Sequence, residues 1–218
     1  MSVEDLNRRC EERPCMGDVG PGYYAHAAAR MPPIRGEILR WFRSALADDS
    51  RKWVAAALLR LKPEAVSSLA SDLLLAAMSE PNPSFNRAFV RPLRGAIDWQ
   101  TAVDSLLRLA KATDPLARGG VARTSYWLRV ELGPPDPTSA RMLNTWILRE
   151  FLQTSDAYAE RSLIAAIVFD EQLIDDDARE LLPQAVTKAR AHPDEYVRHR
   201  LAINLKESTG PFMALTRD

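Results

Sequence analysis

A three-part spacing recurs along this chain and constrains its fold more than any other feature. An acidic residue is followed one helical turn later by a basic residue, and an alanine comes one turn after that. Self-similarity of this kind is typical of stacked helix pairs, in which each unit buries its apolar face only against its neighbours. The copies are Asp48-Lys52-Ala56, Asp114-Arg118-Ala122, Asp194-Arg198-Ala202 and, stretched by one residue, Asp156-Arg161-Ala165.

The residue types of this triplet suggest a role for each position. Aspartate is a preferred residue for capping a helix N-terminus. A basic residue one turn later faces that carboxylate or the one in the next unit, and a small alanine lets adjacent helices approach closely. Asn82, Asn86 and Val90 form a degraded copy, so the predicted units begin near residues 48, 82, 114, 156 and 194.

Apolar residues at three- and four-residue spacing predict that almost everything after residue 33 is helical. The 15 prolines outnumber the 9 glycines and fall between the apolar stretches, where they mark helix starts and stops. The sequence predicts an all-α fold of ten helices without strands. The predicted helices cover residues 38–46, 53–61, 63–77, 85–93, 99–110, 115–130, 143–151, 163–169, 178–189 and 197–205.

The first 33 residues differ from the rest, because closely spaced prolines and glycines interrupt any long periodicity. We expect residues 1–33 to form an irregular N-terminal arm that contains one short helix, from Tyr23 to Met31. Residues 34–218 are expected to form a single repeat domain.

Composition argues against several classes of protein. Lysine plus arginine equals aspartate plus glutamate at 29 each, so no net charge draws the whole chain to nucleic acid or lipid. No apolar run approaches the roughly 18 to 20 residues of a membrane helix. Two cysteines, Cys10 and Cys15, are too few and too close to staple a domain, which favours a reducing, cytoplasmic location.

No constellation typical of catalysis or metal binding is present in the sequence. The three histidines, His26, His192 and His199, are scattered, and no glycine-rich phosphate loop or nucleophile turn occurs. We therefore expect no metal, no cofactor and no enzymatic activity. The acidic run from Asp170 to Glu180 fits a solvated turn before a helix better than a catalytic or cation site, and a contact surface for a basic partner is its alternative. Gly119-Gly120 is interpreted as a close helix contact or a loose first turn rather than an anion site.

The last copy of the triplet carries a family resemblance. Pro193-Asp194-Glu195-Tyr196-Val197-Arg198, followed by Leu201-Ala202 and Leu205, resembles a HEAT-type repeat. The resemblance implies a right-handed α-α superhelix, a HEAT-like solenoid, of about five helix pairs with a concave groove. It also implies a non-enzymatic binding module, such as a bacterial adaptor or immunity-type protein, that grips a protein or peptide partner in this groove.

The segment from Ser84 to Val130 supports an alternative function. It holds eight basic and three acidic residues, a net charge of +5. The alternative is a HEAT-like protein that binds nucleic acid through residues 87–129. A DNA base-excision glycosylase is one protein of this kind. HEAT-like glycosylases use tryptophan, aspartate and arginine in a basic groove, but Trp99 and Asp104 are five residues apart and do not share a helix face. A homodimer is a third alternative. The candidate binding residues are Arg87, Arg91, Arg94, Arg118, Arg123 and Trp127.

The remaining tryptophans are expected in the core. Trp41, Trp53, Trp99 and Trp146 each lie in phase with an apolar stripe, whereas Trp127 is not clearly in phase with one.

Overall fold

The computed structural model of the chain describes residues 2–12, 21–112 and 114–206. These residues form twelve α-helices and four short 3-10 helices with no strand, which confirms the predicted all-α class. Within them, no helix combines the length and the apolar character needed to cross a bilayer. The α-helices are α1 (Val3–Glu12), α2 (Pro21–Ala29), α3 (Gly36–Leu46), α4 (Lys52–Leu59), α5 (Ala70–Ser79), α6 (Arg87–Val90), α7 (Trp99–Ala112), α8 (Pro115–Leu132), α9 (Pro137–Gln153), α10 (Ala157–Ile164), α11 (Leu181–Arg190) and α12 (Glu195–Asn204), and the 3-10 helices are η1 (Pro63–Leu69), η2 (Arg91–Leu93), η3 (Glu171–Leu173) and η4 (Asp176–Ala178).

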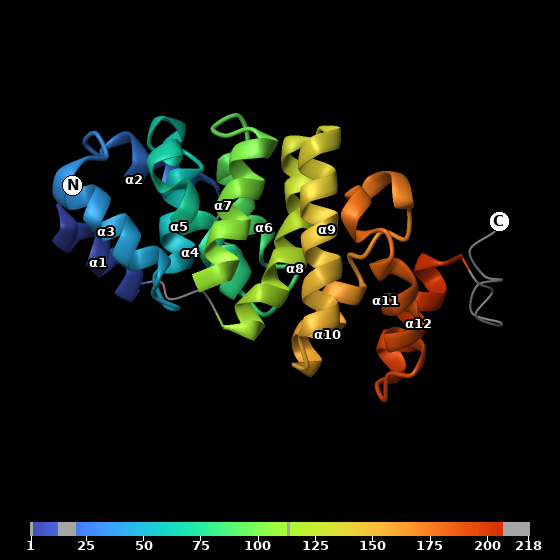
Figure 1. Ribbon diagram of the computed structural model, residues 1–218. Coiled ribbons are helices and arrows are strands. Elements are labelled where there is room, and N and C mark those ends of the chain that lie inside the picture. The colour runs from blue at the N-terminus through green and yellow to red at the C-terminus, as the bar shows by residue number, and fades with distance from the viewer. Residues whose placement is uncertain (1, 13–20, 113, 207–218) are drawn as a thin grey trace, which may run out of the picture.

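The helices follow one another along an elongated molecule, with α1 to α3 at one end and α11 and α12 at the other (Figure 1). From α7 onward, consecutive helices pack as the pairs α7 with α8, α9 with α10, and α11 with α12. Contacts between pairs join α8 to α10 and α10 to α12 on one side, and α7 to α9 and α9 to α11 on the other. The helices α8, α10 and α12 therefore lie next to one another although they are far apart in sequence.

Three aspartates of the recurring triplet cap helices, as the sequence predicts. The carboxylates of Asp114, Asp156 and Asp194 accept hydrogen bonds from backbone N–H groups at the starts of α8, α10 and α12. The basic residue of one copy also reaches the next copy, because Arg161 forms an ion pair with Asp194. Asp48 instead holds the turn before α4, where it accepts from the N–H groups of Ser50 and Arg51.

Two glycines allow helix α8 to lie close against both α5 and α10. A Cβ atom on Gly120 would lie 2.0 Å from the carbonyl oxygen of Met78, and one on Gly119 would lie 2.8 Å from the Cα atom of Ala159. No side chain fits at such distances without backbone movement. The close helix contact predicted for Gly119-Gly120 is confirmed, and it explains two poor helix formers inside a helix of 18 residues.

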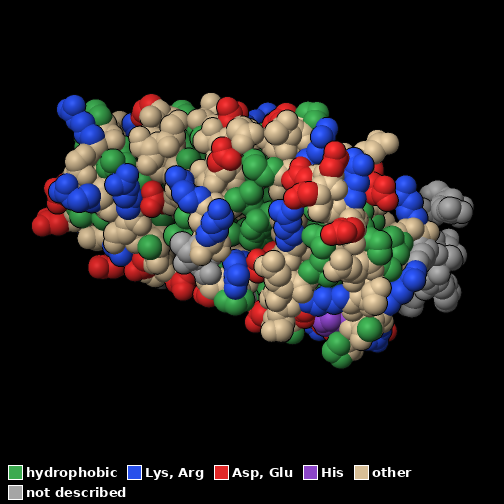
Figure 2. Space-filling view, viewed as in Figure 1, with side chains coloured by type: hydrophobic (Ala, Val, Ile, Leu, Met, Phe, Trp, Pro, Cys, Tyr) green, Lys and Arg blue, Asp and Glu red, His purple; other side chains and the backbone are tan. Residues whose placement is uncertain are grey.

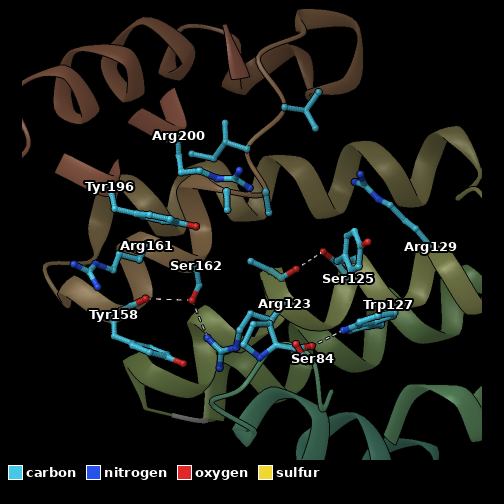
Figure 3. A pocket seen from close by; sticks show the side chains of 17 residues that line it. Ser84, Arg123, Ser125, Trp127, Arg129, Tyr158, Arg161, Ser162, Tyr196 and Arg200 are labelled. Carbon is cyan, nitrogen blue, oxygen red and sulfur yellow. Dashed lines mark hydrogen bonds between the residues drawn. The ribbon is translucent and has the colours of Figure 1, made fainter. Parts of the chain in front are cut away.

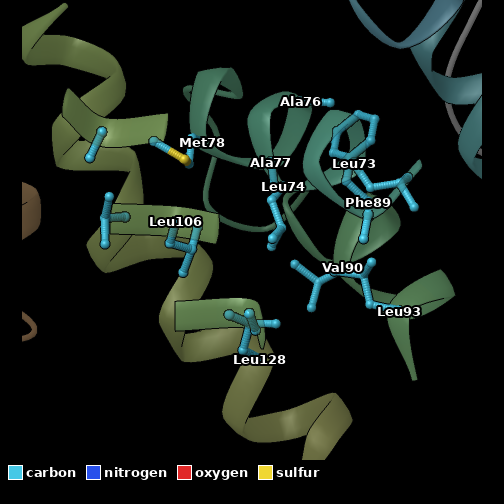
Figure 4. Close-up of a cluster of buried hydrophobic side chains, with 14 of the residues drawn as sticks. Leu73, Leu74, Ala76, Ala77, Met78, Phe89, Val90, Leu93, Leu106 and Leu128 are labelled. Atoms are coloured by element: carbon cyan, nitrogen blue, oxygen red, sulfur yellow. The ribbon is translucent and has the colours of Figure 1, made fainter. Parts of the chain in front are cut away.

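The buried apolar core includes residues from all parts of the described chain, from Leu6 in α1 to Leu201 in α12. Figure 4 shows part of it, where apolar side chains of α5, α6, α7 and α8 meet around Leu74, Phe89 and Leu106, all fully buried. Trp41 and Trp99 are buried as predicted, and Trp53 and Trp146 are half-buried against the same core.

Two local predictions differ from the structure. The apolar run 163–169 was expected to be helical, but α10 ends at Ile164, and residues 167–170 have no regular structure. A short apolar run satisfies a buried loop as well as a buried helix, so periodicity could not decide. The expected irregular arm contains two helices, and in α1 Leu6 is fully buried. Helix α1 was not predicted, because residues 1–33 were taken together as one segment rich in proline and glycine. Residues 13–20 lie outside the described part.

Candidate functional site

A pocket of about 640 Å³ opens on the row formed by α8, α10 and α12 (Figure 3). Each helix contributes side chains, and the loop before α6 closes one edge through Pro83 and Ser84. The volume falls within the roughly 300–1,000 Å³ that is usual for ligand pockets. Its other lining residues are Ala122, Arg123, Ser125, Tyr126, Trp127, Arg129, Tyr158, Arg161, Ser162, Ala165, Ala166, Ile167, Val168, Tyr196 and Arg200.

The lining is basic and aromatic. Four arginines and four aromatic side chains belong to it, and among the described residues that line it there is no aspartate, glutamate, histidine or cysteine. This local composition contrasts with the neutral chain as a whole, whose two signs of charge are interspersed over the face shown in Figure 2. A pocket of this composition favours an anionic ligand that has flat or apolar parts.

Arg123 forms the recessed part of this positive charge. Its residue is only 9% exposed, and its Nη1 donates to the hydroxyl of Ser162 at 2.8 Å. Its Nη2 donates to the backbone oxygens of Met78 and Glu80 at 3.2 and 3.3 Å, while its buried Nε has no hydrogen-bond partner. Burial lowers the pKa of Arg123, although an arginine stays charged at neutral pH. None of its hydrogen bonds in the structure goes to a carboxylate oxygen.

Arg161, Arg200 and Tyr196 form the opposite side of the pocket. The guanidinium carbons of Arg161 and Arg200 lie 5.8 and 5.9 Å from the ring centre of Tyr196, within cation–π range. The hydrogen bond and ion pair with Asp194 raise the pKa of Arg161. Arg200 is half-buried and its Nε, too, is buried without a partner.

The aromatic side chains are anchored by backbone oxygens of the loop before α6. The indole N–H of Trp127 donates to Pro83 at 2.6 Å, and the hydroxyl of Tyr158 donates to Pro81. The guanidinium carbon of Arg123 lies 5.1 Å from the ring centre of Tyr158. Held at both ends, these rings have few other orientations, so the pocket is largely formed before any ligand arrives.

The structure brings together two of the six candidate residues from the sequence. Arg123 and Trp127 line the pocket, and Arg87 lies beside it, 5.3 Å from the ring centre of Trp127 and bonded to Glu131 at 2.7 Å. Arg118 forms an ion pair with Glu150 at 3.3 Å, and so contributes to packing between α8 and α9. Arg91 and Arg94 are exposed at and just after η2, away from the pocket lining.

The sequence interpretation missed the contributions of α10 and α12. A signal was present, because Tyr126, Tyr158 and Tyr196 are each followed three or four residues later by an arginine. The three arginines are Arg129, Arg161 and Arg200, and all six side chains line the pocket. This tyrosine–arginine pair occurs once in each of α8, α10 and α12. The net charge of the segment from Ser84 to Val130 does not reveal it.

The pair considered for glycosylase chemistry lies elsewhere. Trp99 is buried and its indole N–H donates to the carbonyl of Gly133 at 3.0 Å, while Asp104 accepts from Gln100 at 3.0 Å. Neither residue lines the pocket. The part of the chain that the structure describes also contains no group of three or more histidine, cysteine, aspartate or glutamate side chains that is placed to hold a metal ion.

Comparisons of the chain with protein-family models, with curated proteins and with solved structures find no match.

Proposed function

We propose that this protein binds nucleic acid through the pocket on α8, α10 and α12. The observation that carries the proposal is the tyrosine–arginine pair that each of these helices contributes to a lining without carboxylates. Arginine binds phosphate through several N–H donors at once, and an aromatic ring offers a face on which a base stacks. A ligand that repeats phosphate and base along its length fits a protein surface that repeats their partners.

The proposed architecture is the HEAT-like solenoid that the sequence resemblance implies. The aspartate caps of α8, α10 and α12, and the contacts that join helix pairs of the same kind, support it. In such an array equivalent residues of successive units line one surface. Tyr158 and Tyr196 are equivalent in this sense, since each lies two residues after the capping aspartate of its helix, whereas Tyr126 lies near the other end of α8. About five helix pairs, a right-handed superhelix and a cytoplasmic location belong to the same proposal.

The pocket favours nucleic acid over the protein or peptide partner that the sequence resemblance suggested. A groove for an apolar peptide needs no cluster of arginines, whereas this lining presents four of them. An acidic peptide is the protein ligand that would satisfy those charges, and it therefore serves as the competing ligand in the test.

We propose binding rather than catalysis. Base excision and other hydrolytic reactions need a general base or an activated water, and the described lining offers no carboxylate or imidazole for that role. Its serines have no such base beside them in the pocket.

Fluorescence anisotropy with labelled 12-nucleotide strands and hairpin duplexes, each as DNA and as RNA, tests this function across a salt series. We expect affinity to fall with salt at a log–log slope of about −0.7 to −0.9 for each phosphate contacted. The double variant Arg129→Gln/Arg200→Gln should lose two such contacts and flatten the slope by about 1.5.

Arg149→Gln is the matched control. Arg149 lies on α9, exposed and paired with Asp177 at 2.9 Å, and it does not line the pocket. Its loss removes one positive charge from the surface and should leave the slope unchanged. Binding of a polyglutamate peptide without binding of any oligonucleotide would replace nucleic acid by a protein partner.

A further inference from the structure

We infer that the pocket accepts unpaired nucleotides, so that single-stranded nucleic acid is the ligand and duplex is not. This inference rests on the proposed function and names the substrate class of the same site. It depends on three features of the lining: the recessed position of Arg123, the partly exposed tyrosine rings, and their arrangement along the pocket.

The charge on Arg123 lies below the surface of the pocket. With a residue exposure of 9%, its guanidinium is reached only from inside, past Ser162 and Tyr158, which both contact it. A duplex presents its phosphates on the outside of a wide rod and can approach rim side chains such as Arg161, which is 57% exposed. A flexible single strand can turn one phosphate inward, toward the buried guanidinium of Arg123, which hydrogen-bonds no carboxylate.

The tyrosine rings offer faces that paired bases cannot use. Tyr158 and Tyr196 remain 37% and 42% exposed although arginine side chains lie against both rings. In a duplex each base is stacked between its neighbours, so only an unpaired base has a face free for an aromatic ring or a guanidinium plane. We expect such stacking to contribute more to affinity than a contact with the edge of a paired base, because stacking buries one face of the base and one face of the ring.

The lining groups also follow an order that suits consecutive nucleotides. Figure 3 shows Tyr158 and Tyr196 at one end of the pocket with Arg161 between them, and Trp127 and Arg129 at the other end. Arg123 and Arg200 project into the space between these ends from opposite sides. A strand that stacks one base at each end would carry its connecting phosphates past the two central arginines.

A comparison of strand and hairpin tests the inference with the complete chain. A labelled 12-nucleotide strand and a hairpin duplex of the same stem sequence, each as DNA and as RNA, are titrated at one low salt concentration. We expect the strand to bind at least tenfold more tightly than the hairpin. Tyr158→Leu and Tyr196→Leu should each weaken strand binding about tenfold, since stacking of one base is worth roughly that factor.

Phe85→Leu is the control variant. Phe85 is a 36% exposed aromatic residue that packs on Trp53 outside the pocket, so its loss should leave strand binding unchanged. Thermal melting of each variant shows whether it is folded, and a variant that does not fold is replaced by Tyr158→Phe or Tyr196→Phe, which should retain the wild-type affinity for the strand.

The possible results separate this inference from the proposed function. Binding of the hairpin as tightly as the strand would overturn the inference and leave nucleic-acid binding intact. A preference for the strand that survives both tyrosine-to-leucine changes would place the ligand outside the pocket and also overturn it. Failure of every oligonucleotide to bind would overturn both.

Discussion

Two buried cationic side chains of this molecule, Lys52 and Arg123, have different surroundings. The buried Lys52 is paired with Glu80 at 3.1 Å, and the half-buried Lys188 is paired with the buried Glu160 at 2.8 Å. In the pocket, Arg123 is as buried as Lys52 and yet donates only to a hydroxyl and to backbone oxygens. Arg123 feels the charge of Glu80, which is already paired with Lys52, but it hydrogen-bonds no carboxylate, and this leaves room for an external anion.

The largest effect is expected from breaking one of the interior pairs. Glu160 is 5% exposed and accepts from both Lys188 and His192, each at 2.8 Å. Glu160→Gln removes the charge that balances Lys188, and we expect a loss of about 3 kcal/mol in the free energy of unfolding, measured by urea denaturation.

Asp177→Asn is the control for this change. Asp177 pairs with Arg149 while 75% exposed, and such surface pairs contribute at most about 1 kcal/mol. Equal losses for the two variants would mean that the interior pair is no more important for stability than a surface pair.

A second, smaller loss should follow from moving α8 away from α5. Gly120→Ala would place a Cβ atom 2.0 Å from the carbonyl oxygen of Met78, and we expect a loss of about 2 kcal/mol. The same carbonyl accepts from Arg123, so the displaced helix should also weaken ligand binding. Gly119→Ala meets its neighbour at 2.8 Å and should cost less; the opposite order in melting temperature would contradict the packing argument.

The third prediction concerns the unbalanced charge itself. Arg123→Met removes three hydrogen bonds, one to Ser162 and two to backbone oxygens, but it breaks no ion pair, and we expect a loss of about 1 kcal/mol in the free energy of unfolding. Lys188→Met is the matched change in the interior, where it leaves Glu160 without one of its two partners and should cost clearly more. If Arg123→Met were the more destabilising of the two, the pocket arginine would be a structural residue.

The sequence predicted the helical class and the caps well because both depend on local chemistry. Apolar spacing and an aspartate before a helix operate within one or two turns, so Asp114, Asp156 and Asp194 could be assigned without a structure. The close contact at Gly119-Gly120 was one of two interpretations that the sequence left open, the other being a loose first turn.

The site was less predictable because it is assembled from three helices that lie far apart in sequence. The basic segment 87–129 supplied Arg123, Trp127 and Arg129, but Arg87 and Arg118 pair with Glu131 and Glu150 instead. Whether an arginine is balanced depends on which acid the fold brings near it. The charge of a segment does not contain that information, and neither does the tyrosine–arginine spacing, since Arg161 lines the pocket and is still paired with Asp194.

The smallest effect on stability is expected at the surface pair of Asp48 and Arg51, because water solvates a charge there when its partner is removed. Hydrogen bonds from Ser50 and Arg51 lower the pKa of Asp48 to about 2. A carboxyl whose pKa is depressed by folding stabilises the protein above its unfolded pKa of about 3.9, and that stabilisation is lost as the pH falls through the folded value. The wild type should therefore exceed Asp48→Asn in stability at pH 6 by less than about 1 kcal/mol, because the side chain is 37% exposed, and the gap should close near pH 2. Urea denaturation of both proteins between pH 2 and 6 measures this difference, and a gap that stays constant over that range would show that the turn is held by its hydrogen-bond geometry and not by the charge of Asp48.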